Sequence, residues 1–409
     1  MNFRFLHAAD LHLGSPFLGL AQKDDDVAAR FASAGRSAFE DLITKAIEED
    51  VSFVVIAGDI FDGEWKDASI GLFFNRQLAR LSNRNIPTYI LRGNHDAESL
   101  VTRSLTWPES VFEFSPRRPQ THRIEDLRVA LHGRGFPHRE VVENYAVDYP
   151  KPVAGWFNIG VLHTACGRAG HENYAPCGVA DLAARGYDYW ALGHVHAYEI
   201  VSDDPWIVYP GNLQGRSIRE CGERGAVIVE VADGIVAKVR RVVTDHARWA
   251  EVHVDASPHD DQTGLLRAVE TEVRPHAAAA AGRLLAVRVV LTGATRLHSR
   301  FVADREHLRD EVEAAAQRCA ADIWLERLRI DTTEPQQSAR DAALTEIDLA
   351  AALKDCEADT AVRMRVADLV KTVQDKLPGG MAEDASAALD LNSILTEARA
   401  LALGRSAEA

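Results

Sequence analysis

Polar side chains of the types that bind divalent metals follow five apolar segments, at the point where each segment ends. In chain order the motifs read Asp-x-His, Gly-Asp-x-x-Asp, Gly-Asn-His-Asp, a single His and Gly-His-x-His. Their seven candidate ligands are Asp10, His12, Asp59, Asn94, His163, His194 and His196. Burying these groups together without a cation would leave charge unpaired in a dry site, which is strongly unfavourable. We therefore expect the seven side chains to hold metal.

The ligand types narrow the choice of metal. Carboxylate, amide and imidazole groups without a thiolate favour manganese, iron or zinc in a catalytic site over a structural zinc site built from cysteines. Seven ligands exceed the needs of one open catalytic metal and suit two metals that share a bridging carboxylate. Such a pair activates water against a phosphate ester, so the sequence predicts two-metal phosphoester chemistry.

The segments that precede the motifs read as β-strands. Short apolar runs alternate with helical stripes, one from Phe39 to Ile47 and one from Ile70 to Leu81. This alternation predicts an α/β layered domain, in which the carboxyl ends of the strands form the functional crevice. The five motifs would then meet at one edge of the sheets.

The pattern changes twice along the chain, so we expect three parts. Residues 1–245 form the domain with the motifs, and residues 246–334 read as a smaller α/β domain. In that domain we expect the helix that carries Leu265 and Val273 to stop at Pro275. Residues 335–409 show only helical stripes, which predict a C-terminal helical region that packs on the small domain or binds a partner.

Composition limits the class of protein. The formal net charge of −15 argues against a protein that coats DNA unselectively, although arginines cluster locally between residues 117 and 139 and between residues 216 and 224. The start of the chain does not read as a signal peptide, and no apolar run predicts a membrane span. The five cysteines are scattered and never form a CxxC pair, which fits a cytoplasmic location without disulfides. We expect these cysteines to be inert.

The five motifs, in this order and spacing, resemble the calcineurin-like metallophosphoesterase signature. The resemblance implies a layered β-sandwich flanked by helices. It also implies that Asp59 bridges the metals and that His95 gives a proton to the leaving oxygen, with Asp96 or Asp62 orienting its imidazole. One metal would be held by Asp10, His12, Asp59 and His196. The other would be held by Asp59, Asn94, His163 and His194.

A finer resemblance is to DNA-repair exonucleases of the SbcD type, and within them to the shorter YhaO-like branch. It is carried by the segments Phe5 to Gly14, Leu131 to Phe136 and Tyr209 to Glu220. This resemblance implies 3′-to-5′ exonuclease or single-strand endonuclease activity with manganese, a capping domain, and a coiled-coil ATPase partner of the SbcC type. The sequence leaves open whether the chain forms a homodimer.

Three arginines near the motifs are candidate contacts for substrate phosphates. They are Arg92, Arg216 and Arg219. Trp107 and Tyr174 either stack on bases or pack in the core. Two other functions remain in competition with the nuclease. One is a phosphoesterase of nucleotides or other small phosphorylated substrates on the same fold, and the other is a scaffold that has lost its metals.

Overall fold

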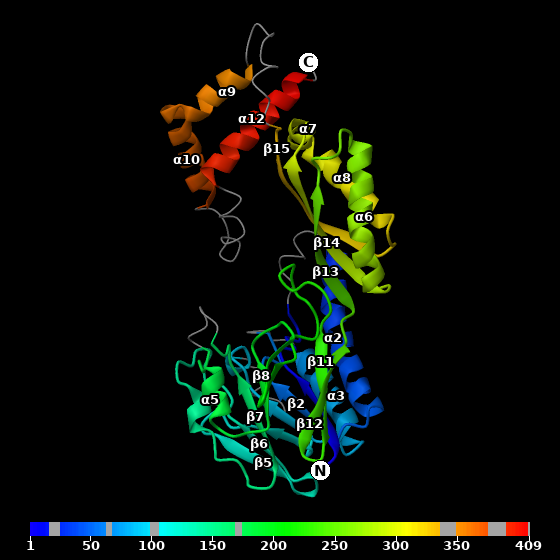
Figure 1. The fold of residues 1–409 in the computed structure, drawn as a ribbon, viewed down its shortest axis with the longest axis vertical. Coiled ribbons are helices and arrows are strands. Elements are labelled where there is room, and N and C mark those ends of the chain that lie inside the picture. Colours follow the sequence, from blue (N-terminus) through cyan, green and yellow to red (C-terminus); the bar gives the residue numbers. More distant parts are fainter. Residues whose placement is uncertain are drawn as a thin grey trace. The chain divides into compact units, whose positions relative to one another are not determined.

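The computed structural model describes residues 1–15, 25–62, 68–98, 106–167, 174–335, 349–374 and 390–407. These residues divide into two compact units, Met1–Trp249 and Ala250–Ala409 (Figure 1). None of the helices in the described ranges combines the length and apolar character needed to cross a bilayer.

The first unit contains two six-stranded sheets. One has the order β12-β11-β1-β2-β3-β4, in which β1 to β4 run parallel and β11 is antiparallel to β1 and β12. Its strands are β1 (Phe3–Ala8), β2 (Phe53–Ala57), β3 (Thr88–Leu91), β4 (Val111–Glu113), β11 (Gly225–Ala232) and β12 (Ile235–Val243).

The second sheet has the order β5-β6-β7-β8-β10-β9. Strands β6, β7, β8 and β10 run parallel, and β5 and β9 close the two edges antiparallel. Its strands are β5 (Gln120–Ile124), β6 (Val129–Gly133), β7 (Phe157–His163), β8 (Tyr189–Gly193), β9 (Glu199–Asp203) and β10 (Trp206–Tyr209).

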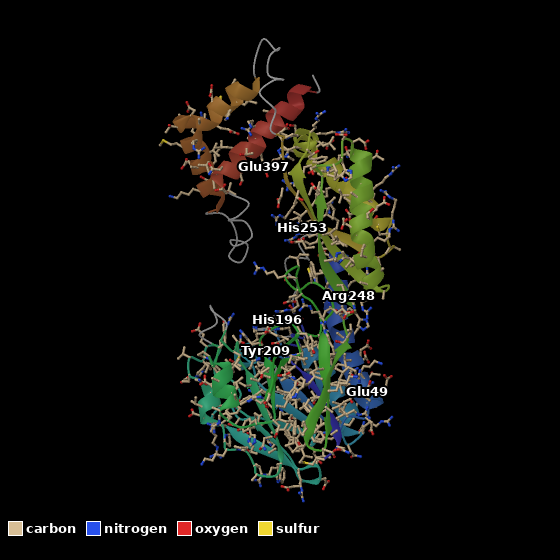
Figure 2. All side chains as sticks on the ribbon, viewed as in Figure 1. Glu49, His196, Tyr209, Arg248, His253 and Glu397 are labelled. Carbon is tan, nitrogen blue, oxygen red and sulfur yellow. The ribbon has the colours of Figure 1, made fainter. Side chains whose placement is uncertain are left out.

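The inner strands β2, β3, β7 and β8 are buried along their whole length because each sheet is covered on both sides there. In β2, Phe53 and Val55 pack into the cluster between the two sheets, whereas Val54 and Ile56 pack into the cluster beneath the helices. This alternation follows from the two-residue period of a strand. Figure 2 labels Tyr209, which ends β10 and is buried in the cluster on the outer face of the second sheet. The expected layered β-sandwich flanked by helices is confirmed.

The helices of this unit cover the outer faces. The stripes predicted around Phe39 and Ile70 lie on α2 and α3, and both are buried against the first sheet. A smaller cluster on the outer face of the second sheet includes Tyr145 and Leu182. The helical segments are α2 (Asp25–Glu48), α3 (Ala68–Ser82) and α5 (Val179–Ala183), with the short turns η1 (Asp96–Glu98), η2 (Glu125–Leu127) and η3 (Tyr145–Asp148).

The second unit has a three-stranded sheet in the order β13-β14-β15, backed by α6 and α8. The prediction that the first of these helices stops at Pro275 is wrong, because α6 continues to Ala280. The buried Ala277 and Ala280 extend the packed face of the helix beyond the proline, and this packing compensates for one lost backbone hydrogen bond. The elements are β13 (Ala247–Asp255), α6 (Gln262–Ala280), β14 (Leu284–Ala294), α7 (His298–Ala303), α8 (Arg305–Gln317) and β15 (Ile323–Thr333).

Helices follow this sheet in the chain, with bounds α9 (Leu349–Ala358), α10 (Thr360–Gln374) and α12 (Leu391–Ala407). Helix α12 contacts α7 and α9. The stripe predicted on α10 is not covered by the described residues, since Leu369 is 65% exposed and Val373 is 48% exposed. The helical stripes predicted for residues 335–409 also include Ala343, Ile347, Leu377 and Leu389, which lie outside the described residues.

Candidate metal centre

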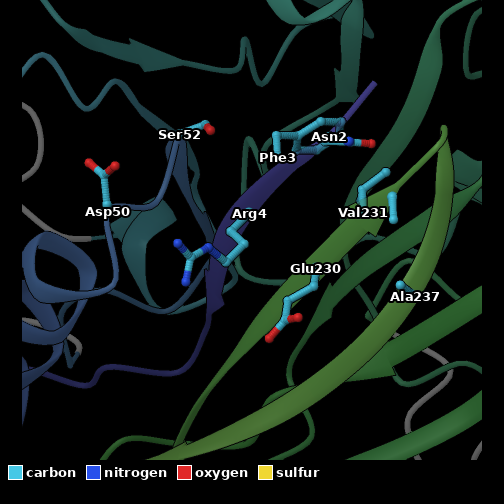
Figure 3. Close-up of a pocket in the computed structure, with 9 residues that line it drawn as sticks. Asn2, Phe3, Arg4, Asp50, Ser52, Glu230, Val231 and Ala237 are labelled. Atoms are coloured by element: carbon cyan, nitrogen blue, oxygen red, sulfur yellow. The ribbon is translucent and has the colours of Figure 1, made fainter.

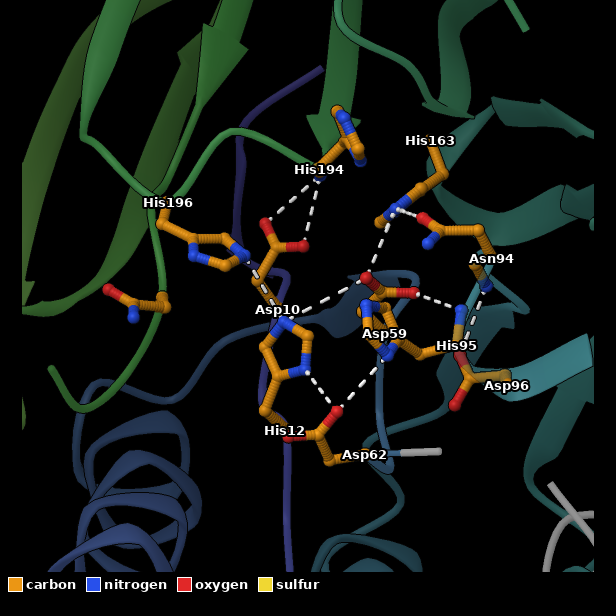
Figure 4. Close-up of polar contacts among 12 residues, drawn as sticks. Asp10, His12, Asp59, Asp62, Asn94, His95, Asp96, His163, His194 and His196 are labelled. Carbon is orange, nitrogen blue, oxygen red and sulfur yellow. Dashed lines mark hydrogen bonds and ion pairs between the residues drawn. The ribbon is translucent and has the colours of Figure 1, made fainter. Parts of the chain in front are cut away.

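The carboxyl ends of strands from both sheets meet at one edge of the sandwich (Figure 4). Asp10 follows β1, Asp59 follows β2 and Asn94 follows β3, all in the first sheet. His163 is the last residue of β7, and His194 comes directly after β8, both in the second sheet. Parallel strands thus deliver ligand-type side chains from distant parts of the chain to one place, as the motif positions predict.

Possible ligand atoms gather in three overlapping groups, each with its atoms within 4.8 Å of one another. Asp59 lies between the groups, because its Oδ2 atom is 3.4 Å from Nε2 of His163 and 3.8 Å from Nε2 of His12. This central position suits a carboxylate shared by two cations. The groups are Asp10 with His12 and His196, His12 with Asp62 and His95, and Asp10 with Asp59 and His163.

Two histidines show that the site fits a cation. The Nε2 atoms of His12 and His196 face each other at 3.2 Å, beside the Asp10 carboxylate. The Nδ1 atom of His12 is buried and lies 3.7 Å from Oδ1 of Asp62. Two ring nitrogens that face each other beside a buried carboxylate form a donor set that fits a divalent cation, which would offset the cost of burying these groups.

The backbone is strained at several of the candidate ligands that meet in the site. Asp10, His12, Asp59 and His194 have φ values of 51°, 42°, 52° and 95°, a region that side chains other than glycine seldom adopt. Such strain is typical of functional sites, where the surrounding structure enforces it. At Gly93 a Cβ atom would lie 2.2 Å from Oδ1 of Asp59, so only glycine allows the close approach of this turn.

Burial sets the electrostatics of the centre. It raises the pKa of Asp10 to about 6 and lowers the pKa of His12 to about 3. Burial also opposes charge on Asp59 and His163, but their mutual attraction outweighs it. The pKa of Asp59 therefore falls below its usual range, and that of His163 rises to about 9. Without a cation, a proton on His163 balances the carboxylates; a bound metal would displace that proton.

The imidazole of His95 contacts Asp62 and not Asp96. Nδ1 of His95 lies 3.1 Å from Oδ1 of Asp62. Asp96 is fully buried and accepts backbone N–H groups from Ile60, Phe61 and Gly93, so it ties two motif loops together. Of the two predicted orienting groups, the structure places only Asp62 at the imidazole. Although burial opposes it, the hydrogen bond with Asp62 raises the pKa of His95.

Arg92 and Arg216, two of the candidate arginines, each contact a carboxylate. Arg92 forms an ion pair with Glu113 on β4, so the expected open phosphate contact is not found in this structure. Arg216 donates to Oδ2 of Asp62 at 3.1 Å and lies 3.5 Å from Nδ1 of His196. It therefore borders the metal centre as part of a charge network. Arg219 is exposed on the same loop.

Glu220 is a site residue that motif reasoning missed. Its Oε1 atom is 2.7 Å from Nδ1 of His196, and its Oε2 atom accepts from Nδ2 of Asn212 at 2.8 Å and from the backbone of Arg216 at 2.6 Å. These contacts, with that of Arg216, lower the pKa of Glu220 to about 2 although burial raises it. The sequence offers one signal for this role, because Glu220 is an acidic residue at the end of the segment Tyr209 to Glu220. Its partner His196 lies 24 residues away in the chain, so the sequence alone does not predict the contact.

The two aromatic candidates, Trp107 and Tyr174, lie in different surroundings. Trp107 packs edge-on against Phe74 and donates to Oε2 of Glu113 at 2.8 Å, so it belongs to the core. The ring of Tyr174 lies 4.7 Å from the ring of His194, at the border of the metal centre. Tyr174 therefore supports a candidate ligand directly.

A pocket of about 410 Å³ lies at the other end of β1 (Figure 3). Its lining includes Arg4, Asp50 and Glu230 but no histidine. Charges of both signs line it, and its described residues are not among the groups that could hold a metal ion.

Comparison with known proteins matches both units. The family described as calcineurin-like phosphoesterase matches residues 3–198, and the middle domain of metallophosphoesterase YhaO matches residues 249–333. The protein described as uncharacterized metallophosphoesterase YhaO, from Bacillus subtilis, is 34% identical over 300 residues, which cover 71% of this chain and 72% of that protein.

More distant similarities were also found. DNA double-strand break repair protein Mre11 from Methanopyrus kandleri is 26% identical over 417 residues, which cover 93% of this chain and 83% of that protein. Among solved structures, a dimetal phosphatase from Danio rerio is 10% identical with a TM-score of 0.37, covering 56% of this chain and 93% of that one.

Proposed function

The chain belongs to the calcineurin-like phosphoesterase family, on its YhaO-like branch, and from this premise we propose that it hydrolyses phosphodiester bonds in DNA. Family membership makes it a metal-dependent hydrolase of phosphoester bonds. The finer elements of the proposal are the DNA substrate, a pair of manganese ions and a role in DNA repair.

The candidate ligands divide between two cations around Asp59. Asp10, His12 and His196 would share one with it, and the second would be held by Asp59, Asn94, His163 and His194. A bound pair of divalent cations supplies polarisation of the phosphoryl group and a nucleophile from water at neutral pH. The glycine turns and the buried carboxylates keep these side chains oriented before the substrate arrives.

His95 is proposed to act as the general acid. Its side chain is 29% exposed, so a substrate can reach it. Nδ1 is engaged by Asp62, which leaves Nε2 as the atom that donates a proton to the leaving oxygen. Arg216 donates to the other oxygen of Asp62 at 3.1 Å. It therefore holds the Asp62 carboxylate in place, and that carboxylate orients the His95 imidazole.

The observation that carries the DNA substrate is the extent of the similarity to the Mre11 protein. It covers 93% of the chain and therefore reaches beyond the unit that holds the metal centre. A hydrolase of small phosphate esters does not need the additional α/β and helical segments. Their presence supports a polymeric substrate.

One observation favours a second candidate, a phosphoesterase of nucleotides or other small substrates. Arg92 and Arg216 were expected to contact the DNA backbone, but each is held by a carboxylate. A long polyanion gains affinity from each phosphate that a free cation meets. Pairing of these two arginines reduces that gain near the metals.

A cleavage assay separates the two candidates. The purified chain, loaded with Mn²⁺ or Mg²⁺, is given single-stranded and duplex DNA labelled at either end, and bis-p-nitrophenyl phosphate in parallel. Shortening of the strand from its 3′ end would support the exonuclease, and internal cuts in single strands the endonuclease. Asp59→Ala serves as the control for contaminating nuclease. Hydrolysis of the small diester without cleavage of either DNA would refute the proposal.

The proposed protein partner is a coiled-coil ATPase of the SbcC type. The uncovered apolar stripe on α10, where Leu369 and Val373 are exposed, offers a helix face that such a partner can cover. The candidate ATPase should bind the full chain, and Leu369→Glu should weaken that binding without changing hydrolysis of the small diester. Binding that is unaffected by Leu369→Glu would remove α10 from the interface.

A further inference from the structure

We propose that Cys166 and Cys177 form a thiol pair that closes to a disulfide when a peroxide oxidises it, beside the metal centre. The two residues stand at opposite ends of the segment that leads from β7 to Tyr174 and on to α5. Such a modification site differs from the inert cysteines expected from their scattered positions in the sequence.

The two thiols are held around one hydroxyl group. The Sγ atom of Cys177 lies 3.5 Å from Oγ1 of Thr164, and Cys166 packs against the apolar cluster to which Cys177 belongs. The same hydroxyl accepts the backbone N–H of Cys166 at 3.2 Å and donates to the carbonyl of Ala175 at 2.8 Å. A disulfide needs Cβ atoms about 3.5–4.5 Å apart, and the shared Thr164 hydroxyl holds the two cysteines at one place.

The pair is asymmetric, which assigns a role to each sulfur. Cys177 is 6% exposed and belongs to the core cluster behind the second sheet, whereas Cys166 is only partly buried at its border. The contact with Cys166, together with burial, raises the pKa of the Cys177 thiol above its ordinary range. Cys177 thus keeps its proton, and Cys166 is the sulfur that a small oxidant from solvent meets first.

The chemistry balances with hydrogen peroxide as the oxidant. Sγ of Cys166 attacks one peroxide oxygen, so an S–O bond forms, the O–O bond breaks and water leaves. Sγ of Cys177 then attacks the sulfenic sulfur of Cys166, so the S–S bond forms, the S–O bond breaks and a second water leaves. The two sulfurs are oxidised by two electrons in total, and the peroxide is reduced to two waters that carry the thiol protons.

The position of the pair connects its oxidation state to the metal centre. Cys166 follows the candidate ligand His163 by three residues, and Cys177 follows Tyr174 by three. The Tyr174 ring lies 4.7 Å from the ring of His194, which in turn lies 5.2 Å from the ring of His163. A covalent link between Cys166 and Cys177 constrains the chain close to His163 and to Tyr174, which packs on His194, and this part of the inference rests on the proposed function.

Peptide mapping tests the pair without any reliance on activity. The full chain, freed of metal with a chelator, is treated with a few equivalents of hydrogen peroxide, blocked with N-ethylmaleimide, digested and analysed by mass spectrometry without reduction. We expect a peptide that links Cys166 to Cys177, lost on reduction with dithiothreitol. The link should be absent from both Cys166→Ser and Cys177→Ser and retained in Cys221→Ser, a control whose exposed thiol donates to the Ile218 carbonyl at 3.0 Å.

The opposite results would overturn the inference. Oxidation of Cys166 to its sulfinic acid while Cys177 stays free, or links that involve Cys221 instead, would show that the two thiols do not act as a pair. Cys177 is buried, so Cys177→Ser could lose the link because it misfolds. Cys166→Ser changes the less buried residue of the pair and tests the link independently.

A second measurement addresses the connection to the metal centre. After the metal is restored, the oxidised protein should hydrolyse bis-p-nitrophenyl phosphate about tenfold more slowly than the reduced protein, the usual size of an effect on groups that support metal ligands. A disulfide that forms without any change in rate would refute the connection. If instead the reduced protein has no phosphodiesterase activity, the proposed function fails while the mapping result still stands.

Discussion

Replacing Glu220 with glutamine tests whether this carboxylate prepares His196 to bind metal. In the structure three donors converge on its two oxygens: Nδ1–H of His196 on one, and the Asn212 amide and the Arg216 backbone N–H on the other. Glutamine offers one acceptor oxygen and one donor nitrogen in the same space. Whichever way its amide is turned, at least one donor then faces another donor.

Both orientations of the glutamine weaken the centre. If the amide nitrogen faces His196, Nδ1 of the imidazole must act as the acceptor, and its proton moves to Nε2, the atom that faces His12 at 3.2 Å. If it faces Asn212 and Arg216, the loop that carries Arg216 loses two hydrogen bonds. Changes in groups that support metal-binding histidines usually lower metal affinity about 10- to 100-fold, which corresponds to about 1.4–2.7 kcal/mol.

The measurement is a titration of the metal-free protein with Mn²⁺, followed by calorimetry and by hydrolysis of bis-p-nitrophenyl phosphate. Glu223→Gln is the matched control, since Glu223 lies on the same loop, is 50% exposed and pairs with Arg248 and Arg241 away from His196. Thermal unfolding of both metal-free variants separates a folding defect from a binding defect. Equal Mn²⁺ affinities for Glu220→Gln and Glu223→Gln would refute the reasoning.

Three further predictions follow from the same structure. His95→Ala should keep its metal content but lose about 10²- to 10⁴-fold in turnover, the contribution typical of a general acid; near wild-type turnover would remove His95 from the mechanism. Asp59→Ala should lose both cations together in metal analysis, and retention of one tightly bound ion would contradict its shared position. Burial lowers the pKa of His7 from 6.5 to about 3. Between these pH values the unfolded chain binds a proton that the folded chain does not. The free energy of unfolding should therefore fall as the pH drops below 6.5, by up to about 1.4 kcal/mol per pH unit. Chemical denaturation at pH 5 and at pH 6 gives the free energy of unfolding at each pH. This free energy should change less between the two pH values in His7→Gln than in the unchanged protein, and an equal change would refute the assignment.

The fold of the first unit could be predicted from the sequence because its inner strands are short runs of consecutive apolar residues. Val54 and Ile56 alternate with Phe53 and Val55, and all four are apolar because both faces of the strand are covered. Helix ends were less accessible. Pro275 marks a local preference to stop, but α6 continues because the alanines beyond it pack into a core that includes β14 and β15.

The types of the candidate metal-binding side chains, and the edge of the sheets where they gather, could be predicted from the motifs because each motif follows a strand. Tertiary structure alone decided which side chains pair there: Asp62 with His95, Arg216 with Asp62, Glu220 with His196 and Arg92 with Glu113. The physical reason is the range of the interactions. A motif is local, whereas Arg216 and Asp62 are 154 residues apart in the chain, and only the packed sheets bring such charges into contact.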